Sequence, residues 1–319
     1  MTQLLGLSRR LALTIALTLT FALPASARSP QKSSGTPATA QRATAARAAR
    51  EAAKPRFKRD VTGALVPDVR AEAAIIFSPE TGRVLWGEHA HDQRSIASIT
   101  KVMTALVFLE REPDLEQTVK ITRDDLRRAS TTYLRSNEKL TLGDVLHVAL
   151  VASDNAAARV LARSGGYAST DAFIARMNEK AVEIGLENTS FTDPSGLDAE
   201  NLSSAYDVSR LITFAARDPQ IAEIMQKADY EFRTSRRRVV RVRNTNKLLG
   251  QLDVVGGKTG FIRKAGYCLA TLLKLPDGPD VAVVVLGAQS NLARFWETRH
   301  LFNWLKDRAP SLLGESDIQ

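Results

Sequence analysis

The spacing of apolar residues predicts strands near both ends of the folded part of this chain and helices between them. In the middle, apolar residues recur at helical spacing, whereas short continuous apolar runs, typical of buried strands, precede and follow that stretch. The helices are expected at 97–109, 142–151, 155–162, 170–186, 205–216 and 292–305. The strands are expected at 73–77, 84–86, 238–242, 254–259, 266–275 and 281–286.

This order of elements predicts a single α+β domain. Because strands lie at the start and at the end, we expect the N- and C-terminal strands to share one antiparallel sheet beside a central block of helices. The turn Pro79-Glu80-Thr81-Gly82 is expected to join the first two strands as a hairpin. Thr141 and Asp144 stand at the N-cap and the third position of the helix that begins at Leu142.

The first 27 residues have the pattern of a secretory signal peptide. Arg9 and Arg10 provide positive charge, and residues 11–23 form an uncharged, mostly apolar run that precedes the cleavage-site sequence Ala25-Ser26-Ala27. A run of this length is too short to cross a bilayer, which takes about 20 residues. We therefore expect cleavage and export to the periplasm. The alternative is an uncleaved membrane anchor.

A change in composition divides the rest of the chain. Residues 28–60 are rich in alanine, arginine, serine, threonine and proline, and Phe57 is their only large hydrophobic residue. Such a segment buries too little apolar surface to offset the entropy of ordering, so we expect a disordered basic linker. An alternative role for it is weak electrostatic association with anionic surfaces of the cell envelope. We expect the folded domain at 61–310 and a C-terminal tail at 311–319.

The net charge does not indicate a nucleic-acid-binding protein. The formal charge is +9, but residues 1–60 account for all of it, and the sequence from Val61 onward is neutral. Cys268 is the only cysteine, which excludes an internal disulfide and fits a buried small residue. The histidines are not spaced as a set of metal ligands, so no metal or other cofactor is expected.

Ser98-Ile99-Thr100-Lys101 is the first of three motifs that suggest catalytic chemistry. On a helix, residues three apart lie on one face, so the Ser98 hydroxyl and the Lys101 amine meet one turn apart. A serine hydroxyl is a weak nucleophile that needs a neighbouring base. Lysine serves as that base only when burial or a nearby positive charge lowers its pKa. The alternative is a helix with a lysine on its surface.

Ser153-Asp154-Asn155 follows the helix predicted at 142–151. A loop between two helices can direct a hydroxyl and an amide into a cleft, which suits substrate binding and proton transfer. Serine, aspartate and asparagine are also preferred N-cap residues, so an ordinary helix start is the alternative interpretation of this motif.

Lys258-Thr259-Gly260 lies at the end of the strand predicted at 254–259. A strand edge with lysine and threonine presents a cation and a hydroxyl to an acidic group, and flanking glycines let a substrate backbone approach closely. The alternative is a turn. The three motifs in this order are far more specific than any one of them alone.

Together, the motifs S-x-x-K, S-D-N and K-T-G resemble the signature of penicillin-binding proteins and class A β-lactamases. The segments IASITKVMTALV, VASDNAAA, GLENTSFTDPSGL, RNTNKLL and VGGKTGF are similar to the low-molecular-mass penicillin-binding proteins, and this likeness covers about residues 73–305. The segments GGYASTDAFIARMNEKA and AGYCL resemble the D-alanyl-D-alanine endopeptidase branch of that family. The resemblance implies a β-lactamase/transpeptidase-like fold. It also implies a carboxypeptidase or endopeptidase that acts on peptidoglycan stem peptides and cross-links and is inhibited covalently by β-lactam antibiotics.

The resemblance also implies roles for the first two motifs. Ser98 attacks the carbonyl carbon of a D-alanyl-D-alanine bond and forms an acyl-enzyme, while Lys101 accepts its proton. Ser153 relays a proton to the leaving amine. Asn155 holds the substrate amide and orients Lys101.

The third motif is implied to bind the substrate. Lys258 supplies positive potential, and Thr259 binds the substrate's carboxylate or its next amide. Gly260 belongs to the same substrate-binding edge. The backbone amides of Ser98 and Phe261 are implied to form the oxyanion hole, where one donor is worth about 3–4 kcal/mol of barrier.

Two other functions remain alternatives. A class A-like β-lactamase would carry Glu-x-x-Leu-Asn between the second and third motifs, and Glu183-Ile184-Gly185-Leu186 begins in this way, but Glu187 follows in place of asparagine. A non-catalytic penicillin-binding scaffold is the second alternative, and the complete set of motifs argues against it.

The sequence also favours endopeptidase over carboxypeptidase action. The carboxypeptidases that this chain resembles often carry an arginine on the strand after the third motif, and it would bind a free C-terminal carboxylate through a bidentate pair. Residues 286–291 contain no arginine, and the next ones are Arg294 and Arg299. A site without that arginine penalises the continuing chain of a cross-link less, unless one of these two folds back into it.

Overall fold

The computed structural model describes residues 54–130, 132–276 and 278–313 of the 319-residue chain. The signal peptide predicted at 1–27 and residues 28–53 of the predicted linker lie outside the described residues. Within the part of the chain that the structure describes, none of the helices has the length and the apolar character that crossing a bilayer requires.

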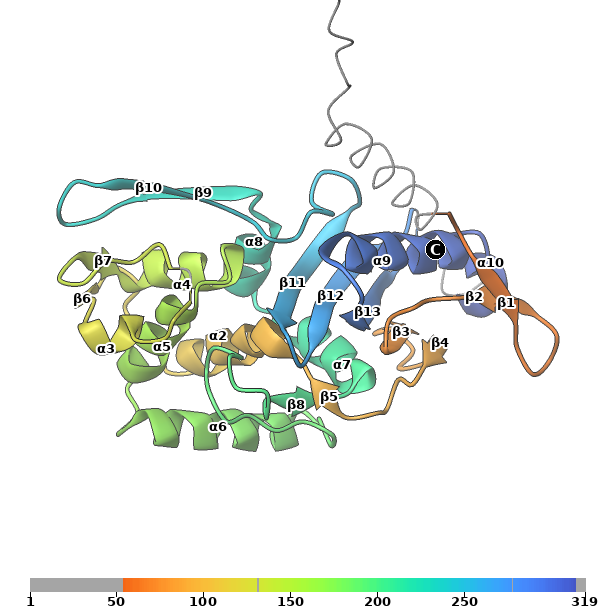
Figure 1. The fold of residues 1–319 in the computed structure, drawn as a ribbon, viewed down its shortest axis with the longest axis horizontal. Helices are drawn as coiled ribbons and strands as arrows, with labels where there is room; N and C mark the ends of the chain where they lie inside the picture. Colours follow the sequence, from red (N-terminus) through yellow and green to blue (C-terminus); the bar gives the residue numbers. More distant parts are fainter. Residues whose placement is uncertain (1–53, 131, 277, 314–319) are drawn as a thin grey trace, which may run out of the picture. The chain divides into compact units, whose positions relative to one another are not determined.

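A five-stranded antiparallel sheet joins the two ends of the described chain. Its strand order is β11-β12-β13-β3-β4, so two N-terminal strands lie beside three C-terminal strands, as the sequence predicts (Figure 1). Every residue of β3 is buried, which explains its continuous apolar sequence. The strands are β3 Ala73–Phe77, β4 Val84–Glu88, β11 Val254–Ile262, β12 Gly266–Lys274 and β13 Asp280–Ala288.

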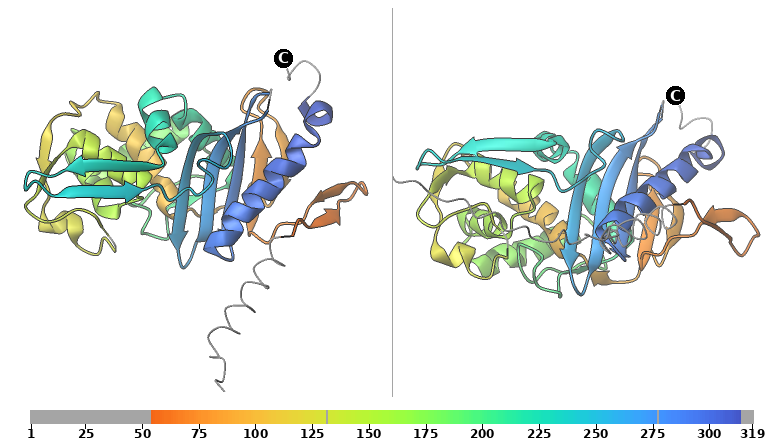
Figure 2. Two further views of the ribbon diagram at one scale, coloured as in Figure 1. Left: turned by 90° about the horizontal axis from the view of Figure 1, so that it is seen from above. Right: turned by 45° about the horizontal axis from the view of Figure 1, so that its top comes forward.

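Helices cover both faces of this sheet. Along β13, Ala282 and Val284 face the core that is shared with the central helices, whereas Val281 and Val283 face a second core, because side chains alternate along a strand. The long helix α9, Asn291–Lys306, crosses the second face (Figure 2).

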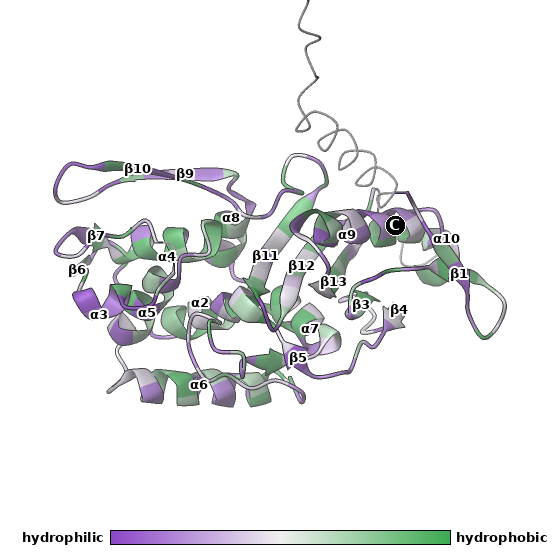
Figure 3. Cartoon of the chain, in the orientation of Figure 1, coloured by the Kyte–Doolittle hydropathy of each residue, from purple (hydrophilic) through white to green (hydrophobic). Residues whose placement is uncertain are grey.

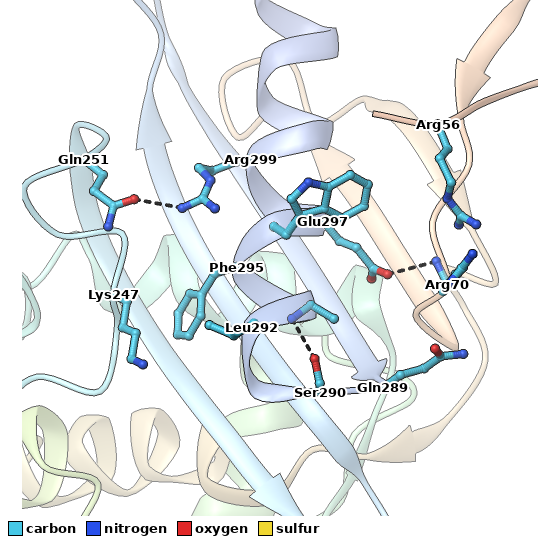
Figure 4. A pocket seen from close by; sticks show the side chains of 12 residues that line it. Arg56, Arg70, Lys247, Gln251, Gln289, Ser290, Leu292, Phe295, Glu297 and Arg299 are labelled. Carbon is cyan, nitrogen blue, oxygen red and sulfur yellow. Dashed lines mark hydrogen bonds between the residues drawn. The ribbon is translucent and has the colours of Figure 1, made fainter. Parts of the chain in front are cut away.

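A pocket of about 570 Å³ lies along α9 (Figure 4). At one side of it, Arg299 donates a hydrogen bond of 2.8 Å to the side-chain oxygen of Gln251. At the other side, the buried carboxylate of Glu297 accepts hydrogen bonds from the backbone amides of Arg70 and Ala71, at 3.0 and 3.1 Å. These bonds fix the segment before β3 against the helix.

The central helices pack into one hydrophobic core with the first face of the sheet. Figure 3 shows hydrophobic residues along these helices and β11, and hydrophilic residues in α3 and β9. The Thr141 hydroxyl accepts a hydrogen bond from the Asp144 amide and caps α4, as predicted. The helices are α2 Lys101–Leu109, α3 Arg123–Leu126, α4 Leu142–Val151, α5 Asn155–Ser164, α6 Thr170–Glu183, α7 Ala205–Ala215, α8 Pro219–Gln226 and α10 Ala309–Leu313, with a 3-10 turn η1 at Ala97–Thr100.

Small antiparallel pairs complete the described chain. In the hairpin of β9 and β10, burial alternates along each strand, with Phe232, Val240 and Val242 facing inward. The pairs are β1 Phe57–Arg59 with β2 Leu65–Pro67, β5 Arg94–Ser95 with β8 Leu202–Ser203, β6 Thr118–Lys120 with β7 Lys139–Thr141, and β9 Asp229–Arg233 with β10 Val239–Arg243.

The predicted α+β class is confirmed, and two elements of the structure cross the predicted domain boundaries. Strand β1 lies inside the linker predicted at 28–60. It is held by pairing with β2 and by the ring of Phe57, which packs edge-on against His300 with centroids 5.0 Å apart. The ordered domain therefore begins before residue 61. Helix α10 continues past residue 310, so the tail predicted at 311–319 begins inside a helix.

Candidate active site

The first motif lies where a 3-10 turn passes into a helix. Ser98 belongs to η1 and Lys101 begins α2, so the single helix predicted at 97–109 is a 3-10 turn followed by an α-helix. Residues three apart are eclipsed in a 3-10 helix. The Lys101 Nζ atom accordingly lies 2.9 Å from Ser98 Oγ.

The buried amine of Lys101 meets three oxygen atoms. Besides its contact with Ser98, Nζ donates to Asn155 Oδ1 at 2.7 Å and to the Ser195 backbone oxygen at 2.5 Å. A neutral amine has two N–H bonds and one lone pair. Because Asn155 and Ser195 accept both N–H bonds, the lone pair faces the Ser98 hydroxyl. This is the geometry of a general base that is poised to take the hydroxyl proton.

The surroundings of Lys101 favour this neutral form. Burial lowers the pKa of Lys101 from its ordinary value to about 7, and the positive charge of Arg159 lowers it as well. The carboxylates of Asp193 and Asp154 act in the opposite direction. A substantial fraction of the amine is therefore unprotonated at neutral pH, as a base for serine requires.

The second motif both caps a helix and places side chains that are suited to chemistry. Asp154 is the N-cap of α5 and accepts a hydrogen bond from the Ala157 amide at 3.0 Å. Asn155 instead turns its side chain to Lys101 and donates to the Ala129 backbone oxygen at 3.0 Å. Ser153 has a φ of +60°, in the left-handed region that non-glycine residues rarely adopt. Capping thus belongs to Asp154, and the groups suited to chemistry flank it.

The third motif joins the second through a direct contact. Lys258 Nζ donates to Ser153 Oγ at 2.6 Å. Burial lowers the pKa of Lys258 well below its ordinary value, and nearby positive charges lower it further. The neighbouring Thr259 hydroxyl donates to the Thr245 hydroxyl at 2.6 Å. Each of the two lysines therefore contacts one serine of the motifs, Lys101 contacting Ser98 and Lys258 contacting Ser153.

Strand β11 is an edge strand of the sheet and packs tightly against η1. A Cβ atom on Gly260 would lie 2.6 Å from the Ile96 backbone oxygen and 3.2 Å from the Ser98 nitrogen, so glycine is required here. Phe261 is half exposed and stacks on Tyr267, with ring centroids 4.2 Å apart. This packing places the segments that carry the two expected oxyanion-hole amides, of Ser98 and Phe261, side by side.

Sequence reasoning missed the loop that supports Lys101. The Asp193 carboxylate accepts hydrogen bonds from the Ser195 hydroxyl at 2.6 Å and from the Gly196 amide at 2.8 Å, which fixes the Ser195 backbone oxygen that Lys101 contacts. Gly196 has a φ of +78°, and a Cβ there would lie 2.0 Å from the Ala97 backbone oxygen. The available signal was the sequence Asp-Pro-Ser-Gly, whose residues are typical of a tight turn.

The structure shows where Arg294 and Arg299 lie, which the sequence did not determine. Arg294 is buried and donates to the backbone oxygens of Gly260 at 2.9 Å and Cys268 at 3.1 Å, so it supports the third motif from α9. Arg299 bonds to Gln251 on the outer side of α9. Both guanidinium groups are thus engaged with groups of the protein itself.

Comparison with known proteins identifies the family and several relatives of this chain. Residues 60–290 match the model of the D-alanyl-D-alanine carboxypeptidase family. The chain is 32% identical over 252 residues to the D-alanyl-D-alanine endopeptidase of Escherichia coli (strain K12), which covers 77% of this chain and 80% of that protein. It is 31% identical over 250 residues to the D-alanyl-D-alanine endopeptidase of Pseudomonas aeruginosa (strain PAO1), covering 76% and 79%.

Comparison with solved structures identifies proteins that have a similar fold. The DD-transpeptidase of Streptomyces K15 superimposes with a TM-score of 0.70 at 27% identity, over 75% of this chain and 97% of that one. Penicillin-binding protein D2 of Listeria monocytogenes, in a cefotaxime-bound form, gives 0.66 at 28% identity, over 75% and 98%. The predicted transpeptidase-like fold is confirmed, and the chain belongs to the D-alanyl-D-alanine carboxypeptidase family of serine hydrolases.

Proposed function

We propose that this enzyme cleaves D-alanyl-D-alanine cross-links of peptidoglycan through an acyl-enzyme on Ser98, and that β-lactam antibiotics acylate the same serine. One observation carries the proposal: the buried amine of Lys101 lies 2.9 Å from Ser98 Oγ and has a pKa of about 7. A serine beside a neutral base is an activated nucleophile. The relatives named as D-alanyl-D-alanine endopeptidases support the choice of substrate.

The reaction begins with proton transfer and attack. The Ser98 proton passes to Lys101 while Oγ forms an ester with the D-alanine carbonyl carbon. The bond from that carbon to the leaving nitrogen breaks, and the leaving amine takes a proton from Ser153, whose hydroxyl lies 2.6 Å from Lys258. Ser153 regains a proton from the protonated Lys101. Water then hydrolyses the ester, with Lys101 again as the base.

The remaining motif residues position the substrate. Asn155 holds the substrate amide, and Thr259 binds the group beyond the scissile bond. The backbone amides of Ser98 and Phe261 donate to the carbonyl oxygen as negative charge develops on it, an interaction that strengthens in the transition state. The free edge of β11 presents a strand with which an extended substrate peptide can pair.

Endopeptidase action is the form of the activity that the site favours. The Thr259 hydroxyl faces Thr245, a neutral partner, and the guanidinium of Arg294 is engaged with backbone oxygens. The described residues therefore place no arginine in hydrogen-bond contact with Thr259. A free terminal carboxylate gains less here than it would from a bidentate arginine, so a continuing peptide is penalised less.

The alternative functions have less support. Glu183, the residue at which a β-lactamase-like motif begins, lies at the end of α6 with its carboxylate bonded to Arg176. This pairing makes it a poor candidate to activate water at Ser98. The scaffold alternative would require a missing nucleophile or base, whereas Ser98 and Lys101 are both in place.

We further propose that the enzyme works in the periplasm. The relatives come from bacteria such as Escherichia coli and Pseudomonas aeruginosa, and their names describe peptidases of D-alanyl-D-alanine bonds. The predicted signal peptide, though outside the described residues, has the features of an export signal. Sequencing the N-terminus of protein recovered from the envelope tests this; a mature chain that retains Met1 would count against cleavage.

The activity is tested with fluorescent penicillin and defined muropeptides. Wild-type protein should label stably, with negligible turnover of the β-lactam, whereas Ser98→Ala should fold normally and remain unlabelled. A penicilloyl group mapped by mass spectrometry to another residue would contradict the assignment of Ser98. Rapid β-lactam turnover would instead support the lactamase alternative.

The specificity is tested by comparing kcat/KM for a D,D-cross-linked muropeptide dimer with that for a monomeric pentapeptide. We expect the dimer to be preferred. Strong preference for the monomer would overturn endopeptidase action and leave the acyl-enzyme mechanism intact.

A further inference from the structure

A pocket of about 520 Å³, between the end of α3 and helix α5, is lined by three arginines and one acid. Its lining residues are Asp124, Arg127, Arg128 and Arg159. Helix α3, which ends just before Arg127, lies beside α5 at one end of the helical block (Figure 1). The function proposed above assigns no role to this pocket.

The arginines of the pocket differ in how firmly they are held. Arg159 donates to the backbone oxygen of Arg127, which ties α5 to the end of α3. Arg127 itself is exposed, and its closest carboxylate, that of Asp124, is 3.8 Å away with both side chains largely in solvent. Such an exposed ion pair contributes little to the stability of the fold. Arg128 is exposed as well, so the guanidinium groups of Arg127 and Arg128 are available to a ligand.

The pocket is linked to the catalytic residues through the backbone. Arg128 and Ser130 both have positive φ, +53° and +61°, and they flank Ala129, whose backbone oxygen accepts a hydrogen bond from Asn155 at 3.0 Å. Strain of this kind persists where the surroundings impose it and concentrates at binding sites. Arg159 lies one helical turn beyond Asn155 on α5.

The charge around the pocket is positive over a wider area. Residues 120–139 and 229–243 together carry twelve lysines or arginines and five acids, although the sequence from residue 61 onward is neutral as a whole. The two segments touch, because the Ser235 amide donates to the Lys139 backbone oxygen at 3.0 Å. Lys139 lies directly opposite Lys120 in the β6–β7 pair, an unfavourable placement of like charges that an anionic ligand would relieve.

We propose that Arg127, Arg128 and Arg159 form a subsite for a carboxylate of the muropeptide that occupies Ser98. This proposal rests on the proposed function and extends it to substrate selection. Arginine binds carboxylate through two parallel hydrogen bonds, and the three arginines outnumber the single Asp124 of the pocket. The surrounding positive charge attracts an anionic peptide toward the cleft. The subsite thus recognises peptidoglycan peptides by their free acidic groups.

The test compares cross-linked dimers that differ only in charge. One dimer has free carboxylates on its stem peptides, and in the other these groups are converted to amides. In the double variant Arg127→Gln/Arg128→Gln, kcat/KM on the free-acid dimer should fall about tenfold, as loss of partly exposed charge-assisted bonds implies, with little change on the amidated dimer. Arg123→Gln, which removes one positive charge from α3 outside the pocket lining, should leave both values unchanged.

Measuring the same variants on the pentapeptide monomer shows on which side of the scissile bond the recognised carboxylate lies. A carboxylate on the acyl side predicts the same loss for monomer and dimer, and one on the leaving side predicts a loss for the dimer alone; either result supports the subsite. An equal loss on free-acid and amidated dimers would overturn it. So would an equal loss in Arg123→Gln.

Binding to a Ser98→Ala background keeps this test independent of catalysis. Free-acid muropeptide should bind this variant more tightly than the amidated form, and the two arginine substitutions should remove the difference. Added salt should weaken the preference, because the arginines are exposed. If the wild-type enzyme proved unable to cleave muropeptides, the proposed function would fail while this binding result still decided the subsite. Equal binding of both forms would refute the subsite.

Discussion

The two walls of the active site are built in different ways. On the sheet wall, Lys258 and Thr259 are buried, Gly260 is pressed against η1, and Arg294 holds the backbone from the side of α9. The helical wall consists of the described loop residues 128–130, 132–133 and 153–155. Here Arg128, Ser130 and Ser153, none of them glycine, have positive φ values.

This difference indicates a division of labour. Groups that stabilise developing charge must be held within a fraction of an ångström, which a packed strand achieves better than a loop. Loops instead present varied side chains to the substrate and are where selectivity is commonly found. We infer that the sheet wall mainly determines the rate of acylation and the helical wall mainly determines which peptide is accepted.

The largest effect is expected at Lys101, which contacts Ser98 and reaches the helical wall through Asn155. Lys101→Met keeps an unbranched apolar side chain up to the ε position and removes the amine. Acylation by penicillin should fall by about a thousandfold, within the range for loss of a general base. Stopped-flow acylation measures the loss, and thermal unfolding serves as the control for folding. A normal acylation rate would exclude Lys101 as the base.

The rigidity of the sheet wall is tested at Gly260. In Gly260→Ala the new methyl group would meet the Ile96 backbone oxygen at 2.6 Å, so β11 must move away from η1. Displacement of the expected oxyanion donor at Phe261 should lower the acylation rate by about a hundredfold. Gly143→Ala in α4 is the matched control, because its methyl group would lie 3.4 Å or more from its nearest neighbours, Leu115 and Thr141. Similar losses in both variants would contradict the role of the wall.

A smaller effect is expected where α9 supports this wall. Arg294→Met removes the donors to the Gly260 and Cys268 backbone oxygens. Leaving buried acceptors unpaired should lower the free energy of unfolding by about 2–4 kcal/mol. The acylation rate should fall only about tenfold, because β11 keeps its pairing with β12. Arg299→Met, on the outer side of the same helix, is the control. Unfolding in urea and acylation kinetics measure both quantities, and an unchanged stability would contradict this support.

The sequence predicted the main elements of the fold because their signals are local. Apolar periodicity located the sheet strands and the long helices, and the cap at Thr141 was confirmed. The strand at 229–233 was missed although polar and apolar residues alternate there, because its outward positions are charged. The strand at 57–59 was placed in a linker, since its order depends on β2 and on the ring of His300, contacts that composition does not reveal.

The candidate site likewise has residues that the sequence revealed and residues that it did not reveal. The three motifs were visible because each depends on side-chain identity at short spacing, and the structure brings them together. The backbone oxygen of Ser195 carries no residue-type signal, so its contact with Lys101 was not predicted. The position of Arg294 depends on how α9 packs on the sheet, which sequence spacing does not determine.

The smallest effect concerns Arg159 on α5, next to the helical wall, whose positive charge acts on Lys101. Only the neutral amine accepts a proton, so the acylation rate should rise with pH through about 7, the pKa of Lys101, and then level off. Arg159 lowers this pKa, so Arg159→Gln should raise it and move the midpoint of the profile to higher pH, whereas Arg159→Lys keeps the charge and the midpoint. Acylation rates from mildly acidic to alkaline pH measure all three midpoints. A midpoint in Arg159→Gln that stays in place or moves to lower pH would show that the charge of Arg159 does not tune the pKa of Lys101.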